Sequence, residues 1–246
     1  MEVAPGTYRA ESRNEVIYAL DCGGAYALVD AGGEAGLAEK LEQLGADGVD
    51  PERISAVFVT HCHGDHVGAI PRLRAQWPVR VVAHRLAVEH LRLCPAYFPL
   101  DGGLVDYTVD EGDTVEIGEL AMQAHHLPGH TPDSVAWQLG DSLFVGDVLR
   151  CDGGIGWMDV HWGSCVGDYR SSLQRLLHMK VARVFPGHGT CGVFTKDMVE
   201  EALGRLNALA EADGRLLTEL GRPAPRRGTG TPAKIVRLST GLAAAS

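Results

Sequence analysis

The sequence lacks an apolar run long enough to cross a bilayer, because its longest apolar stretches have only the length of strands. A membrane-spanning helix needs about 20 consecutive apolar residues. The opening segment, MEVAPGTYRAESRNE, contains neither the basic part nor the apolar part of a secretory signal. We therefore expect a cytoplasmic protein that does not bind membranes.

Paired cysteines and net positive charge are also absent. The six cysteines include no CxxC pair, so we expect reduced and mostly buried thiols. The formal net charge of −10 argues against a nucleic acid as partner. The charge is uneven: from Arg222 onward there are five basic residues and no acidic one, which leaves −15 on the rest of the chain. We expect this basic tail to lie on its own acidic body or on a second subunit of a homodimer.

The chain of 246 residues, with 45% hydrophobic and 22% charged residues, has the composition of a globular protein. Hydrophobic periodicity and turn residues predict a hairpin, then alternating strands and helices, then a strand-rich middle, and then more helix. The expected elements are a hairpin over 15–30, helices over 36–46, 67–77, 85–93, 168–179 and 194–220, and strands over 54–60, 79–84, 103–109, 114–118, 120–127, 134–139, 142–147 and from 181.

Strands covered by helices in both halves predict an α/β protein with two sheets between helical layers. No internal linker is visible. We expect residues 1–193 to form the catalytic domain and residues 194–246 to form a helix and a loop-like basic tail that pack on it.

The segment THCHGDHVGAI, residues 60–70, places three histidines and one aspartate within six positions, directly after the predicted buried strand. A packed core does not accept unpaired imidazoles, whereas loops at the carboxyl ends of strands are where α/β proteins carry chemistry. Three later loops, LPGH, FVGD and FPGHG, also place His or Asp beside glycine after a strand. The four loops together hold His61, His63, Asp65, His66, His130, Asp147 and His188.

This set contains five histidines and two aspartates. One zinc ion takes three or four protein ligands, so seven candidates predict two metal ions that share one carboxylate. Imidazole nitrogens with a few carboxylate oxygens favour Zn²⁺, with iron or manganese as alternatives.

The pattern HCHGDH, followed by His130, Asp147 and His188, resembles the HxHxDH…H…D…H signature of the metallo-β-lactamase superfamily over roughly residues 5–190. The resemblance implies a four-layer αββα sandwich with the metals in the cleft between the two sheets. It also implies one metal on His61, His63 and His130, a second on Asp65, His66 and His188, and Asp147 as the bridge.

Two metal ions about 3.5–4 Å apart generate a hydroxide nucleophile at neutral pH. The sequence contains no GxSxG motif, which agrees with a reaction that needs no protein nucleophile. Asp65 and Asp147 are the carboxylates that we expect to take part in catalysis, chiefly by positioning the metals.

Departures from several branches narrow the expected activity. Related β-lactamases generally lack an aspartate at the position of Asp147. Flavodiiron proteins usually have glutamate at the position of His63. The tRNA-processing nucleases add a basic arm, whereas the body of this chain is acidic. What remains is a group of glyoxalase-II-like thioesterases and lactonases that act on small molecules with a scissile carbonyl. A thioester is the first choice and a lactone the second; a mono-iron persulfide dioxygenase and a β-lactam hydrolase stay open as alternatives.

Substrate-binding residues are expected in two segments. Residues 148–165, VLRCDGGIGWMDVHWGSC, replace the GCGR-type stretch of glyoxalase II. This segment and residues 94–107 are rich in aromatics and predict the walls of a mostly apolar pocket. The candidates are Trp157, His161, Trp162, Tyr97 and Phe98.

Several other side chains have expected roles outside the ligand set. Cys62 lies between two predicted ligands and is expected to point away from the metals, because side chains alternate along an extended strand. Hydroxyl and carboxylate groups beside the ligands are expected to orient them. We expect Thr60, Asp133 and Ser134 in that orienting role, structural roles for His125 and His126, and surface or capping positions for His84, His90 and His178.

Overall fold

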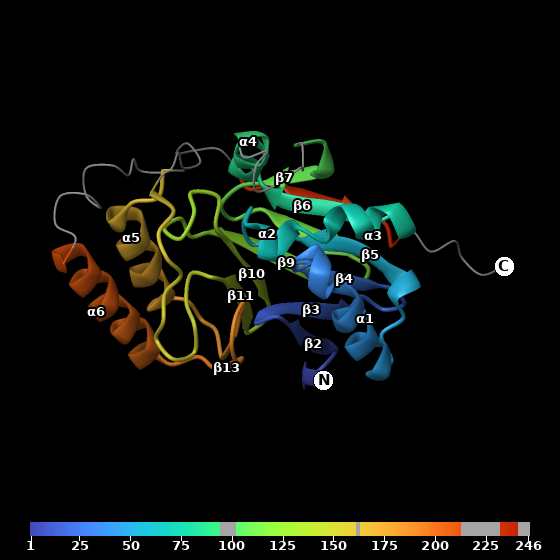
Figure 1. Ribbon diagram of the computed structural model, residues 1–246, viewed down its shortest axis with the longest axis horizontal. Helices are drawn as coiled ribbons and strands as arrows, with labels where there is room; N and C mark the ends of the chain where they lie inside the picture. The colour runs from blue at the N-terminus through green and yellow to red at the C-terminus, as the bar shows by residue number, and fades with distance from the viewer. Residues whose placement is uncertain (94–101, 161–162, 213–231, 241–246) are drawn as a thin grey trace.

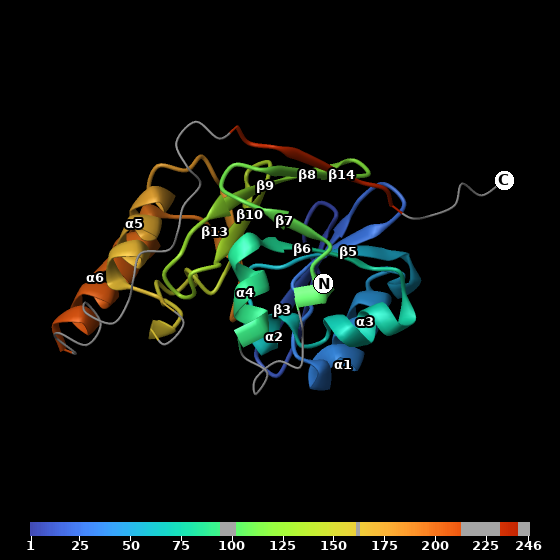
Figure 2. The same ribbon diagram turned by 90° about the horizontal axis from the view of Figure 1, so that it is seen from above.

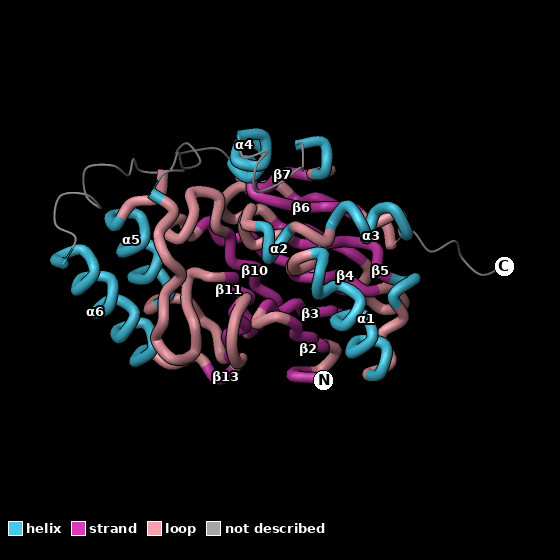
Figure 3. The backbone as a smooth tube through the Cα atoms, in the orientation of Figure 1, coloured by secondary structure: helices cyan, strands magenta, loops and turns pink. Residues whose placement is uncertain are grey.

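The computed structural model describes residues 1–93, 102–160, 163–212 and 232–240. Two seven-stranded sheets face each other, with helices on both outer sides (Figures 1 and 2). Figure 3 shows the strands gathered in the middle and the helices around them. The predicted αββα sandwich is confirmed.

The first sheet has the order β1-β2-β3-β4-β5-β6-β7. Its first four strands pair antiparallel and its last four, from β4 onward, pair parallel. The strands are β1 (Glu2–Ala4), β2 (Thr7–Ser12), β3 (Glu15–Asp21), β4 (Tyr26–Val29), β5 (Ile54–Phe58), β6 (Arg80–His84) and β7 (Tyr107–Val109).

The second sheet has the order β13-β12-β11-β10-β9-β8-β14. It is antiparallel except for the parallel pairs β11–β12 and β14–β8. Its strands are β8 (Thr114–Ile117), β9 (Leu120–His126), β10 (Val135–Leu139), β11 (Ser142–Gly146), β12 (Arg183–Pro186), β13 (Gly192–Val193) and β14 (Ile235–Leu238).

Three apolar layers hold the sandwich together. One lies between the first sheet and the helices α1 (Leu37–Ala46), α2 (Gly64–Val67) and α3 (Ile70–Gln76). A second fills the space between the sheets with buried aromatics. The third lies between the second sheet and the helices α5 (Val166–Leu176) and α6 (Lys196–Ala212). The aromatics between the sheets are Tyr18, Phe58, Trp137, Phe144 and Phe185.

The expected helices are present, most of them with shifted limits. The helix predicted over 194–220 is α6, and the part of that prediction after Ala212 lies outside the described residues. The helix predicted over 67–77 is interrupted after Val67, and α3 begins at Ile70 with Pro71 in its first turn. Proline has no N–H and clashes with the preceding turn, so a helix starts at it more readily than it passes through it. Helix α5 begins at Val166, two residues before the prediction, because the Cys165 sulfur accepts a hydrogen bond from the Asp168 N–H. Helix α4 (Arg85–Leu93) agrees with its prediction.

The basic tail contributes a strand that the sequence did not predict. Residues Ile235–Leu238 form β14, which pairs in parallel with β8 at the edge of the second sheet. Asp113 Oδ1 accepts from the Lys234 N–H at 2.7 Å, and Arg237 forms an ion pair with Glu116 at 2.8 Å. Basic tail residues therefore lie against acidic residues of the same chain. A boundary at residue 193 stays a prediction.

Candidate metal centre

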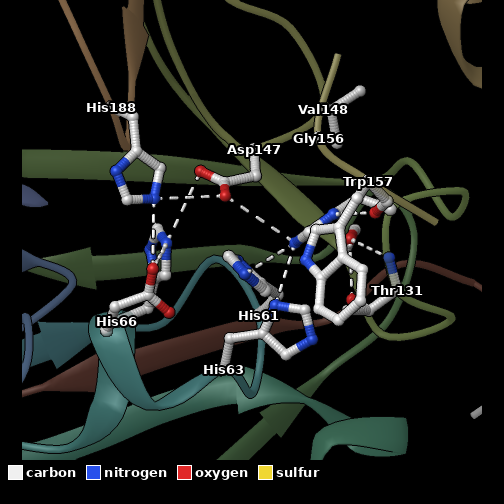
Figure 4. Close-up of polar contacts among 12 residues, drawn as sticks. His61, His63, His66, Thr131, Asp147, Val148, Gly156, Trp157 and His188 are labelled. Atoms are coloured by element: carbon white, nitrogen blue, oxygen red, sulfur yellow. Dashed lines mark hydrogen bonds and ion pairs between the residues drawn. The ribbon is translucent and has the colours of Figure 1, made fainter. Parts of the chain in front are cut away.

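The seven predicted ligands lie in one place, where the loops after β5, β9, β11 and β12 meet (Figure 4). Each loop leaves the carboxyl end of its strand, as the sequence predicted. The side chains form two groups of three, with Asp147 between them. Their role as metal ligands stays a prediction.

The first group consists of His61, His63 and His130. The Nε2 atom of His130 lies 3.0 Å from His61 Nε2 and 3.0 Å from His63 Nδ1. Three ring nitrogens therefore converge on one point, and His61 and His130 are almost fully buried.

In each ring of this group, the nitrogen on the other side has a protein partner. Nδ1 of His130 donates to the Trp157 carbonyl at 2.6 Å, and Nε2 of His63 lies 3.1 Å from Asp159 Oδ2. Nδ1 of His61 lies 3.1 Å from Thr60 Oγ1. A neutral imidazole has only one N–H, so the three converging nitrogens present lone pairs. A cation among them removes their mutual repulsion, and the group fits a metal ion.

The second group consists of Asp65, His66 and His188. Nε2 of His188 lies 3.2 Å from Asp65 Oδ2, and Nε2 of His66 lies 3.8 Å from the same oxygen. The opposite nitrogens are again engaged, since His66 Nδ1 donates to Asp30 at 2.7 Å and His188 Nδ1 donates to the Asn14 carbonyl. This group also presents its ligand atoms to a common point.

Asp147 lies between the two groups. Its Oδ1 is 3.5 Å from His66 Nε2, and its Oδ2 is 3.3 Å from His188 Nε2 and 3.7 Å from His130 Nε2. Two of the buried polar atoms without a hydrogen-bond partner, His66 Nε2 and Asp147 Oδ1, face this centre. Buried polar atoms are rarely left unpaired, so both agree with a site that binds a cation.

The charges of the two groups differ. Burial lowers the pKa of His130 to about 4 despite the nearby carboxylate of Asp147, and burial together with the neighbouring imidazoles holds the pKa of His61 well below its usual range. Neutral imidazole is the form that binds metal. In the second group, hydrogen bonds to Asp147 and Asp65 raise the pKa of His188 to about 10. A metal ion there replaces a proton, so binding releases protons to the solvent.

Asp30 is the most important residue that the sequence analysis missed. One carboxylate oxygen of Asp30 accepts from His66 Nδ1 and from Thr60 Oγ1, each at 2.7 Å, and the other accepts from the Thr60 N–H at 2.8 Å. Thr60 in turn contacts His61, so Asp30 orients one histidine of each group. The signal was present: LVDAGG places an aspartate and two glycines at the end of a strand next to β5.

Other expected roles have mixed outcomes. The orienting role of Thr60 is confirmed, and Cys62 points away from the centre, toward Asp133. Asp133 and Ser134 contact other residues instead of the predicted ligands, because the loop turns them toward α4 and toward Thr131. His84 and His90 are buried, which corrects the expected surface or capping positions. His84 stacks on His126 and His90 contacts Asp133, whereas His178 is exposed.

Trp157 is the described member of the expected substrate wall. Its side chain is 72% exposed and its ring lies 6.2 Å from that of His63 (Figure 4). An apolar ring at the edge of the centre can contact a bound substrate. Outside the described residues lie Tyr97, Phe98, His161 and Trp162.

A family model described as the metallo-beta-lactamase superfamily matches residues 13–188, which is more than half of the chain. The chain belongs to the metallo-beta-lactamase superfamily. The resemblance read from the sequence is thus confirmed. Among the helices that the structure describes, none has the length and apolar character needed to cross a membrane.

Curated relatives of this superfamily member include a hydroxyacylglutathione hydrolase of Rhodopseudomonas palustris, 36% identical over 128 residues, or 51% of this chain and 44% of that protein. A beta-lactamase-like protein 2 homolog of Caenorhabditis elegans is 28% identical over 75% of this chain and 58% of that protein. The chain thus spans about half the length of the curated relatives it matches. These relatives support the prediction of a metal-dependent hydrolase.

Among solved structures, a subclass B3 metallo-beta-lactamase of Bradyrhizobium japonicum superposes with a TM-score of 0.72 at 19% identity, covering 87% of this chain and 92% of the other. The native FEZ-1 metallo-beta-lactamase of Legionella gormanii gives a TM-score of 0.70 at 16% identity, covering 85% and 94%. At this level of identity the likeness shows the fold alone.

Proposed function

We propose that this superfamily member is a binuclear zinc hydrolase that cleaves an ester-like carbonyl, with a thioester as the first substrate class and a lactone as the second. The observation that carries the proposal is the position of Asp147, which contacts His66 and His188 on one side and His130 on the other. The relative named hydroxyacylglutathione hydrolase supports the choice of a thioester.

In this proposal the two groups of side chains hold the metal ions, and carboxylates between and around the groups keep them in position. Bound zinc ions supply a water molecule of lowered pKa and polarise the scissile carbonyl. Asp147 holds the two groups at a fixed separation, and Asp30 and Asp159 keep the rings of His66 and His63 in their ligand orientation. The carboxylate of Asp65 is more exposed than that of Asp147, so it faces the side from which a substrate enters.

The apolar ring of Trp157 forms the wall next to His63 and favours an organic acyl group over a highly charged substrate. A mono-iron dioxygenase of the alternative kind uses only one group of three ligands. Here both groups are complete, and Asp147 contacts each, which favours the two-metal hydrolase.

The first test is a hydrolysis screen of zinc-loaded protein against thioesters, lactones, β-lactams and phosphodiesters, with the metal content measured in the same sample. We expect turnover of a thioester with two zinc ions in the proposed centre. The variant Asp147→Ala should lose at least 10³-fold in kcat, roughly 4 kcal/mol of transition-state stabilisation. Near-normal turnover in Asp147→Ala, or oxygen uptake with a persulfide and one iron per chain, contradicts the proposal.

A further inference from the structure

A second group of ligand-type side chains lies outside the centre described above. It consists of Cys62 from the loop after β5, His90 from α4, and Asp133 from the loop between β9 and β10. Asp133 Oδ1 lies 3.4 Å from Cys62 Sγ and 3.1 Å from His90 Nδ1, and the three ligand atoms lie within 4.8 Å of one another. All three residues are buried.

The second carboxylate oxygen of Asp133 has no partner. Asp133 is 1% exposed, and its Oδ2 is buried without a hydrogen bond. Hydrogen bonds within the trio give Oδ1 its partners but leave Oδ2 without one. An unpaired carboxylate oxygen is costly in a protein interior. A divalent cation held by the trio neutralises the carboxylate, and a carboxylate that binds such an ion with both oxygens leaves neither oxygen unpaired.

The two distances from Asp133 Oδ1 also agree with ligands of one tetrahedral ion. Zinc bonds are about 2.3 Å long to sulfur and about 2.0–2.2 Å long to nitrogen and oxygen. In a tetrahedral site these bonds put the sulfur ligand about 3.5 Å, and the nitrogen ligand about 3.4 Å, from the oxygen ligand. In the structure, Asp133 Oδ1 lies 3.4 Å from Cys62 Sγ and 3.1 Å from His90 Nδ1. Thiolate, imidazole and carboxylate together carry a charge of about −2, which a divalent ion neutralises.

We propose that Cys62, His90 and Asp133 form a third metal site, suited to Zn²⁺, that is separate from the two-metal centre. No ligand is shared between the two places, so this site does not depend on the proposed function. On binding, the ion replaces the thiol proton, which passes to the solvent. The site is structural, because it ties α4 and the loop that follows His130 to the segment between His61 and His63.

Cobalt substitution tests the site directly. The two-metal centre offers only nitrogen and oxygen ligands, so a thiolate-to-cobalt charge-transfer band in the near ultraviolet reports on cysteine ligation alone. We expect the band in the cobalt-loaded full chain, its loss in Cys62→Ser, and its retention in Cys151→Ser, whose thiol belongs to none of the described ligand groups. Zinc content after dialysis should be lower by one ion per chain in Cys62→Ser than in the parent.

The variant His90→Gln provides a second measure if Cys62→Ser does not fold. It keeps the thiol but removes the nitrogen ligand, so the zinc content should again fall by one ion per chain. A parent protein without the band, or a band that persists in Cys62→Ser, overturns the proposal and leaves the trio as a hydrogen-bond network. A zinc content in His90→Gln equal to that of the parent also overturns the proposal. Because the band does not require turnover, this result is independent of the hydrolysis screen.

Discussion

At the scale of single residues, the orientation of the histidines depends on acceptors that lie outside the predicted ligand set. Asp30 has a positive φ of 58°, uncommon for a residue with a side chain. This backbone conformation turns its carboxylate under both Thr60 and His66. One buried side chain thus fixes the tautomer of His66 and, through Thr60, of His61.

The first prediction concerns Asp30. In Asp30→Asn, the amide cannot accept from Thr60 and His66 with the strength of a carboxylate, so zinc affinity should fall by about 10–100-fold. Competition with a chromophoric chelator measures the affinity. The control Asp141→Asn changes an exposed aspartate in the β10–β11 turn and should leave zinc affinity unchanged. Equal affinities in the parent and Asp30→Asn contradict the orienting role.

A second prediction concerns pH and Glu111. Arg175 donates to both Glu111 oxygens, at 2.7 and 3.0 Å. Burial acts to raise the pKa of Glu111, but hydrogen bonds from His125 and Arg175 outweigh burial and lower the pKa from 4.5 to about 2. A carboxylate with a depressed pKa stabilises the fold above its unfolded-state pKa, and this stabilisation is lost as pH falls from about 4.5 to about 2.

Glu111→Gln should therefore lower the free energy of unfolding by about 1 kcal/mol at pH 7, since the group is partly solvent-screened. The difference from the parent should shrink as pH falls below about 4.5. Urea unfolding at pH 7 and at lower pH measures it. Glu116→Gln, which removes an exposed ion pair with Arg237, serves as the control with a change below about 0.5 kcal/mol. A constant difference across this pH range would show that Glu111 acts by packing alone.

At the scale of elements, the segment after β11 contacts both the predicted metal ligands and the expected substrate side of the centre. Its Trp157 side chain lies at the edge of the centre, while the Trp157 carbonyl accepts from His130 and Asp159 accepts from His63. The segment is held in turn by Tyr169, whose hydroxyl donates to the Val148 carbonyl at 3.0 Å. A shift of this segment therefore moves both the expected substrate wall and two ligands.

The third prediction separates these two roles. Trp157→Ala keeps the backbone carbonyl, so zinc content should be unchanged while KM for an apolar thioester rises about tenfold, or about 1.4 kcal/mol. Asp159→Ala removes the partner of His63, so zinc affinity should fall about tenfold or more. Measuring zinc content and KM for both variants checks the separation. Loss of zinc in Trp157→Ala would show that the ring holds the segment in place.

At the scale of the whole molecule, bound metal should contribute to folding because ligands come from four loops on both sheets. The fourth prediction is that a chelator lowers Tm and that added zinc restores it. Binding at a concentration 1,000 times Kd stabilises by about 4 kcal/mol. Differential scanning calorimetry measures the shift. Asp147→Ala should show a smaller shift than the parent, and a Tm that is insensitive to the chelator contradicts tight binding.

Much of this arrangement follows from local sequence signals. The four loops of the centre could be predicted because each carries His or Asp together with glycine directly after an apolar run, and such loops leave the carboxyl ends of strands. The contact of Asp159 with His63 could not, since the two residues are 96 positions apart in the chain. The segment LVDAGG indicates a carboxylate at a strand end, but it does not indicate that Thr60 and His66 are the partners of Asp30. Likewise, His90 has helical surroundings in sequence, and only the tertiary fold buries it beside Asp133.

The strand β14 has a consequence for the order of folding. Its partner β8 is made about 120 residues earlier, so the edge of the second sheet stays unpaired during synthesis until residues 235–238 have been added. Unpaired edges are where nascent chains associate with one another, and contacts this distant in sequence form slowly. The second sheet should therefore finish folding last, because β8 gains its second neighbour only when β14 has been made.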